Sequence, residues 1–256
     1  MKYNFQFSIF NYSAMYCTTR GIIIHTTLYN DNYSIVHVYT ELYGRVSYLV
    51  GRQRKQKARV SNAHFMPLTI VEMEVEHLKT REIQRIKEIR IDYPVVNIPS
   101  HPVKNAIALF LAEILYRIIQ TTESDPKLFE YLCNSIRYLD ILEQGIANFH
   151  LVFLMHLARY LGIFPNAESH YSSEVYFDLL NGVFTTHIPT HPHYLNREES
   201  VVFSRLLRMN YENMALYAFS RKERTMVVQH ILDYYRLHSI DFPEIKSLSV
   251  MQSLFD

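Results

Sequence analysis

A run of positively charged side chains near the front of the chain is the feature best suited to bind a polyanion. Six cations follow one another here without an intervening acid: Arg45, Arg52, Arg54, Lys55, Lys57 and Arg59. The alternation of Val46, Tyr48 and Val50 predicts a strand, and the polar segment after it predicts an exposed loop. Such a loop presents charge to a polyanion such as nucleic acid. A solvated loop without a partner is the alternative.

Three histidines have a spacing that could supply imidazole ligands to a metal: His187, His191 and His193. Zinc needs three or four donors that are held by supporting partners. Here no cysteine is near, and the flanking residues include Pro189 and Pro192. The sequence therefore favours no metal site, and a His-cluster metal-dependent enzyme is the less favoured alternative.

No other arrangement in the sequence is typical of catalysis. The six glycines do not cluster into a phosphate-binding loop, and there is no nucleophile elbow, His-Glu-x-x-His helix or Cys-x-x-Cys pair. Glu72, Glu74 and Glu76 share one face of an alternating segment, which is typical of the solvated side of a strand. The sequence predicts a protein that is not an enzyme, with no catalytic, cofactor-binding or metal-binding residues.

Aromatic side chains accompany the cations. The chain has 20 Tyr and 15 Phe, and four tyrosines lie in or beside the predicted front strands: Tyr33, Tyr39, Tyr43 and Tyr48. Stacking of a base on such a ring contributes about 1–3 kcal/mol and tolerates any base. Each ring taken alone is equally suited to the core, but as a group beside a basic loop the rings favour single-strand binding.

Charge is distributed unevenly along the chain. Residues 1–93 hold 13 Lys and Arg against 8 Asp and Glu, a difference of +5, whereas residues 94–256 hold 13 against 17, a difference of −4. The polyanion is therefore expected to meet the front half. Two distant cysteines, Cys17 and Cys133, exclude a disulfide framework and fit a reducing compartment. No apolar run approaches the length of a membrane span, and the polar interruptions of the first fourteen residues argue against a signal peptide.

The front half has the pattern of short strands. Apolar or alternating segments are expected as strands at 20–27, 33–40, 45–50, 68–78 and 83–91. Five short strands in about seventy residues suit a small barrel, with the OB-fold favoured and an SH3-like barrel as its main competitor. Residues 1–17 are expected to be a poorly ordered extension, and residues 18–93 the OB-fold DNA-binding domain.

Helical spacing begins after the prolines at 94, 99 and 102, so residues 94–256 are predicted to form an all-α domain. Helices are expected at 103–120, from Asp125 to about 139, at 146–161, from Asn196, and from Ser220 to about 238. Between them, residues 164–195 are expected to be an irregular excursion with one short helix around 175–180. The predicted fold class is thus α+β multidomain, a five-stranded OB barrel followed by helices.

Several segments, taken in order, resemble the bacterial recombination mediator family RecO. They are Gly21-Ile22-Ile23-Ile24-His25-Thr26, Tyr39-Thr40-Glu41-Leu42-Tyr43-Gly44-Arg45, the basic run from Gly51 to Lys57, Met66-Pro67-Leu68-Thr69, Leu111-Ala112-Glu113-Ile114-Leu115 and Lys246-Ser247. The resemblance covers residues 18–253, and it rests on order and spacing rather than on one motif.

The resemblance implies a non-catalytic protein of DNA repair. Such proteins bind single- and double-stranded DNA, anneal complementary strands, associate with RecR and with the single-strand-binding protein SSB, and help to load RecA onto SSB-coated DNA. It also implies a cytoplasmic, nucleoid-associated location with no membrane partner. Carried over by position, Arg45 and the cations from Arg52 to Arg59 match the basic barrel segment and are expected to touch backbone phosphates, which carry no base identity.

The sequence departs from that family in two places. Many members carry a four-cysteine zinc site in the region of residues 164–195, where this chain has no cysteine, so no structural zinc is expected. Some members carry adjacent arginines for the acidic SSB tail where this chain has Ala147 and Asn148. Arg117, Arg137 and Arg159 are alternative residues for that role, and the sequence does not choose among them. An adaptor that binds only proteins is the main alternative function.

Overall fold

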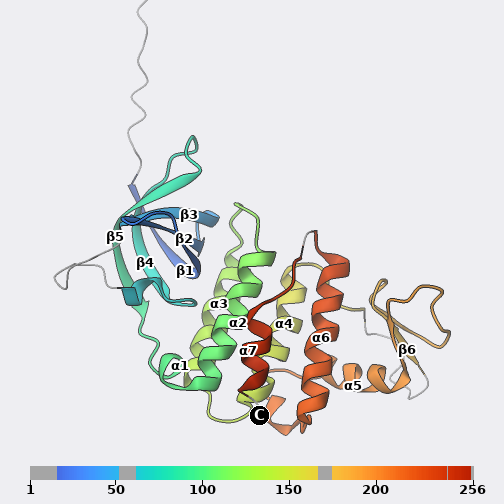
Figure 1. Cartoon of the computed structure of the whole chain (residues 1–256). Helices are drawn as coiled ribbons and strands as arrows, with labels where there is room; N and C mark the ends of the chain where they lie inside the picture. The colour runs from blue at the N-terminus through green and yellow to red at the C-terminus, as the bar shows by residue number, and fades with distance from the viewer. Residues whose placement is uncertain (1–15, 52–61, 167–174, 241, 255–256) are drawn as a thin grey trace, which may run out of the picture.

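The chain folds into a β-barrel followed by a helical domain (Figure 1). The computed structural model describes residues 16–51, 62–166, 175–240 and 242–254. The barrel strands are β1 (Tyr16–Leu28), β2 (Tyr33–Thr40), β3 (Gly44–Gly51), β4 (Ile70–Glu76) and β5 (Ile83–Tyr93), with the short helix η1 (Asn62–Phe65) before β4. Strand β1 begins at Tyr16, two residues before the predicted start of the domain.

The strands close in the order β1-β2-β3-β5-β4. Strand β1 pairs antiparallel with both β2 and β4, and a short parallel ladder joins Ser47–Leu49 of β3 to Ile83–Arg85 of β5. This five-stranded closed barrel confirms the OB-type prediction.

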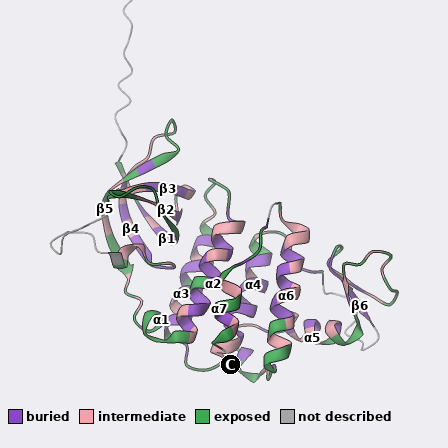
Figure 2. Ribbon diagram, in the orientation of Figure 1, coloured by how far each residue is buried: buried purple, intermediate pink, exposed green. Residues whose placement is uncertain are grey.

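The middle of strand β1, residues 21–24, is buried on both faces, which explains its continuous apolar run. Ile23 points into the barrel, where it packs in the cluster that includes Val38 and Met73. Its neighbours Ile22 and Ile24 belong instead to the core shared with the helices. Since successive side chains of a strand point to opposite faces, a strand between two cores must be apolar at every position. Figure 2 shows buried residues on both the barrel and the helices that face it.

The helical domain contains seven α-helices in the described part of the chain. They are α1 (Asn97–Ser100), α2 (Pro102–Ile118), α3 (Pro126–Ile141), α4 (Phe149–Tyr160), α5 (Arg197–Leu207), α6 (Arg221–His238) and α7 (Ser247–Ser253), with single turns η2 (Ile146–Asn148) and η3 (Met214–Leu216). The helix expected from residue 146 begins with the turn η2 and becomes α4 only at Phe149, whereas the starts predicted at Asp125, Asn196 and Ser220 are confirmed. Asp125 caps α3 by accepting from Leu128 N, and Asn196 and Ser220 form capping boxes at α5 and α6.

The predicted short helix around residues 175–180 is wrong. This segment holds strand β6 (Tyr176–Asp178), which pairs with β7 (Val183–Thr185) and β8 (Tyr194–Leu195) in a small sheet. Phe177 is fully buried, with its ring centroid 4.9 Å from that of Phe184 and 4.6 Å from that of Phe203. Strands this short are fixed by packing against α5, because their own sequence is too short to establish a period.

Candidate nucleic-acid interface

The structure describes one of the six predicted phosphate-binding cations. Arg45 is the second residue of β3, whereas Arg52, Arg54, Lys55, Lys57 and Arg59 lie outside the described residues. The chain enters that basic segment from Gly51 at the end of β3 and leaves it at Asn62 in η1. The seven residue steps of β3 place its two ends roughly 23 Å apart.

Arg45 is anchored to the end of α2. Its Nη1 donates to the backbone oxygens of Tyr116 and Ile119, at 2.9 and 3.0 Å, and to Oε1 of Gln120 at 2.9 Å. Its Cζ lies 4.5 Å from the centroid of the Tyr116 ring. The last carbonyls of a helix lack partners within the helix, so a cation there satisfies them and complements the helix dipole. Arg45 thereby joins the barrel to the helical domain.

The other end of β3 is open and aromatic. Tyr33 of β2 stands opposite Gly51 in the antiparallel ladder, and 44% of its surface is exposed. Leu28 at the end of β1 and Tyr29 in the connection from β1 to β2 are 62% and 60% exposed. The β1–β2 connection is one of the two loops with which OB-folds bind oligonucleotides. Exposed rings here flank the point from which the basic segment departs.

A groove of about 540 Å³ lies beside the first half of β3, between the β4–β5 connection and the α2–α3 connection. We call it the β4–β5 groove. Arg45, Lys79 and Arg81 line it together with one acid, Glu82, and Arg81 also pairs with Glu76 at 2.7 Å. The β4–β5 connection is the second oligonucleotide-binding loop of OB-folds.

An aromatic pair forms one wall of the β4–β5 groove. The rings of Tyr43 and His77 stack with centroids 4.0 Å apart and planes 6° from parallel. Tyr43 is fixed by the contact of its hydroxyl with Cys17 Sγ at 2.9 Å. Burial and the nearby charge of Lys79 lower the pKa of His77. A flat ring pair beside cations has the composition of a base-stacking surface.

The four tyrosines proposed for stacking therefore separate into two pairs. Tyr39 and Tyr48 are fully buried and belong to the core, as the alternative interpretation expects. Tyr33 is exposed and Tyr43 is half-buried against His77. Sequence reasoning missed Tyr29, Lys79 and Arg81. Tyr29 lies in the β1–β2 connection, and Lys79 and Arg81 lie in the β4–β5 connection. Because these two connections bind oligonucleotides in OB-folds, the predicted barrel could have indicated all three residues.

The three glutamates of β4 face solvent as predicted, and each is ion-paired. Glu72 pairs with Arg90, Glu74 with Lys87 at 2.7 Å, and Glu76 with Arg81. The pairs run along the outer face of β4 and β5, where exposed ion pairs contribute little to stability. This face of the barrel is consequently close to neutral.

The histidines at 187, 191 and 193 do not converge on one point. His191 Nε2 lies 3.3 Å from Asp178 Oδ2, the rings of His191 and His193 are 6.1 Å apart, and His187 contacts Thr186. Within the described residues, no three His, Cys, Asp or Glu side chains are grouped so that they could hold a metal ion.

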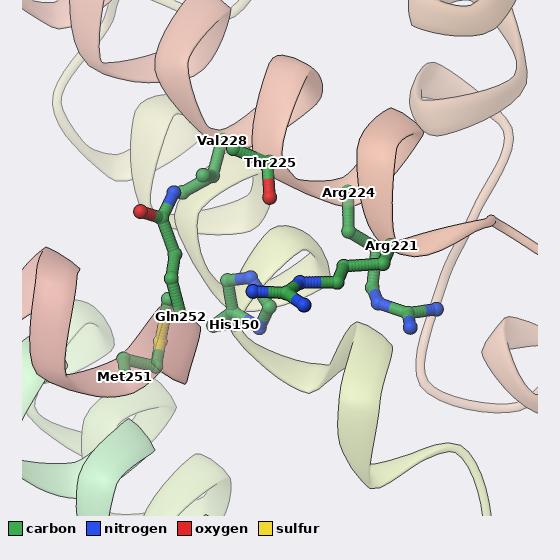
Figure 3. Close-up of a pocket in the computed structure, with 7 residues that line it drawn as sticks. All are labelled: His150, Arg221, Arg224, Thr225, Val228, Met251 and Gln252. Atoms are coloured by element: carbon green, nitrogen blue, oxygen red, sulfur yellow. The ribbon is translucent and has the colours of Figure 1, made fainter. Parts of the chain in front are cut away.

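A small cavity of about 10 Å³ lies where α4, α6 and α7 meet (Figure 3). His150 of α4 lines it with Arg221 and Arg224 of α6, and burial followed by the charge of Arg224 lowers the pKa of His150 to about 3. The cavity has room for about one water molecule, so it belongs to the packing of the domain.

The residues considered for an acidic-tail site occupy separate surroundings. Asn148 is buried, and its Nδ2 donates to the backbone oxygens of Met214 and Tyr217. Arg137 pairs with Asp92 at 3.4 Å, and Arg159 lies over the Phe164 ring at 4.2 Å. Arg117 lies against Tyr116 at the barrel junction.

Among the described residues, no helix is long and apolar enough to cross a membrane.

The structure thus defines a class, an OB-type barrel joined to a helical domain by a shared core. Residues 15–94 match the family model described as Recombination protein O N terminal, and residues 99–247 match Recombination protein O C terminal. The chain belongs to the RecO family.

Relatives that span nearly the whole chain carry the name DNA repair protein RecO. The one from Bacteroides fragilis is 46% identical over 239 residues, covering 93% of this chain and 98% of the relative. That from Azobacteroides pseudotrichonymphae is 44% identical over 238 residues with the same coverage, and that from Porphyromonas gingivalis is 36% identical over 247 residues, covering 94% of this chain and 100% of the relative. These names are those of a DNA repair protein and not of an enzyme.

Proposed function

We propose that this protein is a non-catalytic recombination mediator in DNA repair. It binds single- and double-stranded DNA, anneals complementary strands, and acts with RecR to load RecA onto single strands coated by SSB, in the cytoplasm at the nucleoid. Family membership supports the role in repair. The observation that carries the DNA-binding part is the open end of β3, where exposed Tyr33 lies opposite Gly51 and five cations follow in sequence.

The physical mechanism is collection of phosphates without reading of sequence. Arg52, Arg54, Lys55, Lys57 and Arg59 neutralise backbone phosphates together with Arg45, and neighbouring rings stack bases. Two strands held on one cationic surface repel each other less and stay within reach of pairing. In this proposal the helical domain contacts the protein partners RecR and SSB.

Fluorescence anisotropy of a labelled single-stranded oligonucleotide across a salt series tests this proposal. A variant with Arg52, Arg54, Lys55 and Lys57 all changed to Gln loses up to four phosphate contacts. Its log–log salt slope should therefore be shallower by up to about 2.8, with a large loss of affinity at low salt. The annealing rate of complementary oligonucleotides should fall in parallel.

A matched control removes four exposed cations of the helical domain by changing Lys127, Arg197, Arg208 and Lys222 to Gln. This control has the same net charge as the test variant and should retain most of the wild-type slope. Equal slopes for both variants would show that net charge, and not the basic segment, governs binding. A wild-type protein that binds no DNA at low salt would leave the protein-only adaptor as the function.

A further inference from the structure

A cluster of cations and rings lies where the barrel meets the end of α2. We call it the Tyr116 cluster, and its members are Tyr116, Arg45, Arg117, His25 and His37. The Tyr116 ring is 4.3 Å from the His25 ring and 5.0 Å from the His37 ring, measured between centroids. The guanidinium carbons of Arg45 and Arg117 lie 4.5 and 5.4 Å from the centroid of the same ring. Barrel and helical domain contribute to one surface.

Two guanidinium groups share this ring, and neither forms an ion pair with a carboxylate of the described residues. Glu113, one helical turn before Arg117, is the acid whose charge acts on His25 and is acted on by Arg117. Its carboxylate is already engaged, because it accepts from Lys246 N at 3.0 Å, Ser247 N at 2.8 Å and Ser247 Oγ at 2.5 Å. Although burial opposes it, these hydrogen bonds hold the pKa of Glu113 below its ordinary value.

Arg117 is the unsatisfied member of the cluster. Its side chain makes no hydrogen bond or ion pair within the part of the chain that the structure describes, and its Nε is buried without a partner. A buried donor without a partner is unfavourable, and a ligand that accepts its hydrogen bond removes that penalty. Arginine is also the side chain best shaped to bind phosphate with two parallel hydrogen bonds.

Electrostatics around the cluster favour an anion. Burial lowers the pKa of Arg45, contacts with Tyr116 oppose this effect, and the charge of Arg117 adds to it. Burial, Arg117 and Arg45 together lower the pKa of His25, against the charge of Glu113. The charges of Arg45 and Arg117 thus oppose each other and disfavour protonation of His25, and a bound anion would relieve that repulsion.

The cluster adjoins the proposed DNA surface. Arg45 belongs both to it and to the β4–β5 groove, and His37 of β2 contacts Ser47 of β3 at 2.9 Å on the outer barrel face. The outer face of strands 2 and 3 is where OB-folds bind oligonucleotides. A strand that occupies the β4–β5 groove can continue across Tyr116.

We infer that the Tyr116 cluster binds a backbone phosphate of a nucleic-acid strand, with Arg117 of the helical domain as a phosphate ligand beside Arg45 of the barrel. This inference rests on the proposed DNA binding and extends it, because it makes the site composite. The exposed His25 ring then offers a stacking face for the adjoining base.

The test compares Arg117→Gln with Arg197→Gln by anisotropy of labelled oligothymidine across a salt series. Arg197 is a matched control because it also lies over a tyrosine ring, 5.3 Å from that of Tyr176, but at the start of α5 beside β6. Arg117→Gln should make the log–log slope shallower by about 0.7 and weaken binding roughly 5- to 10-fold at about 50 mM salt. Arg117→Lys keeps the charge and should keep most of the slope, and Arg197→Gln should match the wild type.

Three outcomes would overturn the inference. If the wild type binds with a steep slope that Arg117→Gln leaves unchanged, DNA binding stands and the composite site does not. If Arg117→Gln instead weakens an acidic peptide with a free carboxylate and spares oligothymidine, the cluster is a peptide site. If the wild type itself does not bind oligothymidine, the proposed function fails and the inference fails with it.

Discussion

The two ends of strand β3 differ in what surrounds them. At its start, Arg45 N donates to Thr121 O at 3.0 Å, and Ser124 Oγ donates to Glu41 O at 2.7 Å, so the α2–α3 connection is fastened to the barrel. At its end, Gly51 is exposed and Tyr33 beside it is 44% exposed. One strand therefore has an end held by the helical domain and an end available to a partner.

The six cations form one basic run in the sequence, but the structure separates Arg45 from the rest. Arg45 is near the other five in sequence, whereas its guanidinium already has three protein acceptors at the end of α2. A side chain held this way contributes to stability and to position as well as to charge. We expect removal of Arg45 to change both, and removal of the segment after Gly51 to change binding alone.

The largest expected effect is on stability, and it comes from adding a side chain at the Gly44 end of β3 rather than at the Gly51 end. Gly44 has a φ of +60°, and a Cβ there would lie 2.4 Å from the Glu123 carbonyl oxygen. Gly44→Ala should lower the free energy of unfolding by roughly 2–4 kcal/mol, because it combines left-handed strain with a backbone clash. A Cβ on Gly51 would meet nothing within 4 Å, so Gly51→Ala should stay within about 0.5 kcal/mol. Urea unfolding measures both, and equal losses would contradict the comparison.

Tyr33→Ala tests the open end by binding rather than by stability. Loss of one stacking ring should weaken single-stranded DNA binding by about 1–3 kcal/mol while leaving the salt slope unchanged, because no phosphate contact is removed. Tyr160→Ala serves as a control, since Tyr160 is 40% exposed on α4 of the helical domain. If both variants bind like the wild type, Tyr33 is a surface residue without a role in DNA binding.

Arg45→Lys tests the held end at constant charge. All three contacts come from Nη1, and a lysine side chain ends one bond short of that atom and lacks the planar group that lies over Tyr116, so unfolding free energy should fall by about 1 kcal/mol. Most of the salt slope of DNA binding should remain, because the positive charge remains. A variant that keeps full stability would show that these hydrogen bonds do not secure the end of α2.

The barrel could be predicted from the sequence because its signals are local. Val71, Met73 and Val75 alternate with acids, and the β-branched apolar run around Ile23 indicates a strand. The capping boxes at Asn196 and Ser220 are equally local. Strand β6 was missed because three residues show no period, and its position depends on contacts with α5.

The division of the candidate site could not be predicted, because it depends on residues far apart in the chain. Arg45 binds carbonyls more than seventy residues later, at a helix end that the sequence does not place beside β3. Tyr39 is buried although its strand face is otherwise half-exposed, because Phe129 of α3 covers it. Tyr33, on the same face of β2, is instead 44% exposed.

The smallest expected effect concerns His37, which lies between the two ends of β3. Burial, Arg45 and His25 lower its pKa to about 4, whereas the unfolded chain has an ordinary value near 6.5. The unfolded state therefore binds the proton more tightly, so the contribution of His37 to stability is lost as pH falls from about 6.5 towards 4. One histidine gives at most about 1.4 kcal/mol per pH unit, and partial exposure reduces this value.

Urea unfolding at several pH values should show a shallower pH dependence for His37→Gln than for the wild type. Other histidines with lowered pKa values, including His150, act in the same direction, so the difference between the two proteins is the relevant quantity. Ser47, which contacts His37 Nδ1 at 2.9 Å, accepts or donates according to the ring tautomer and can also bond glutamine. Identical pH dependence in both proteins would mean that the outer face of β2 and β3 is more hydrated than the contacts of His37 with Tyr116 and Ser47 indicate.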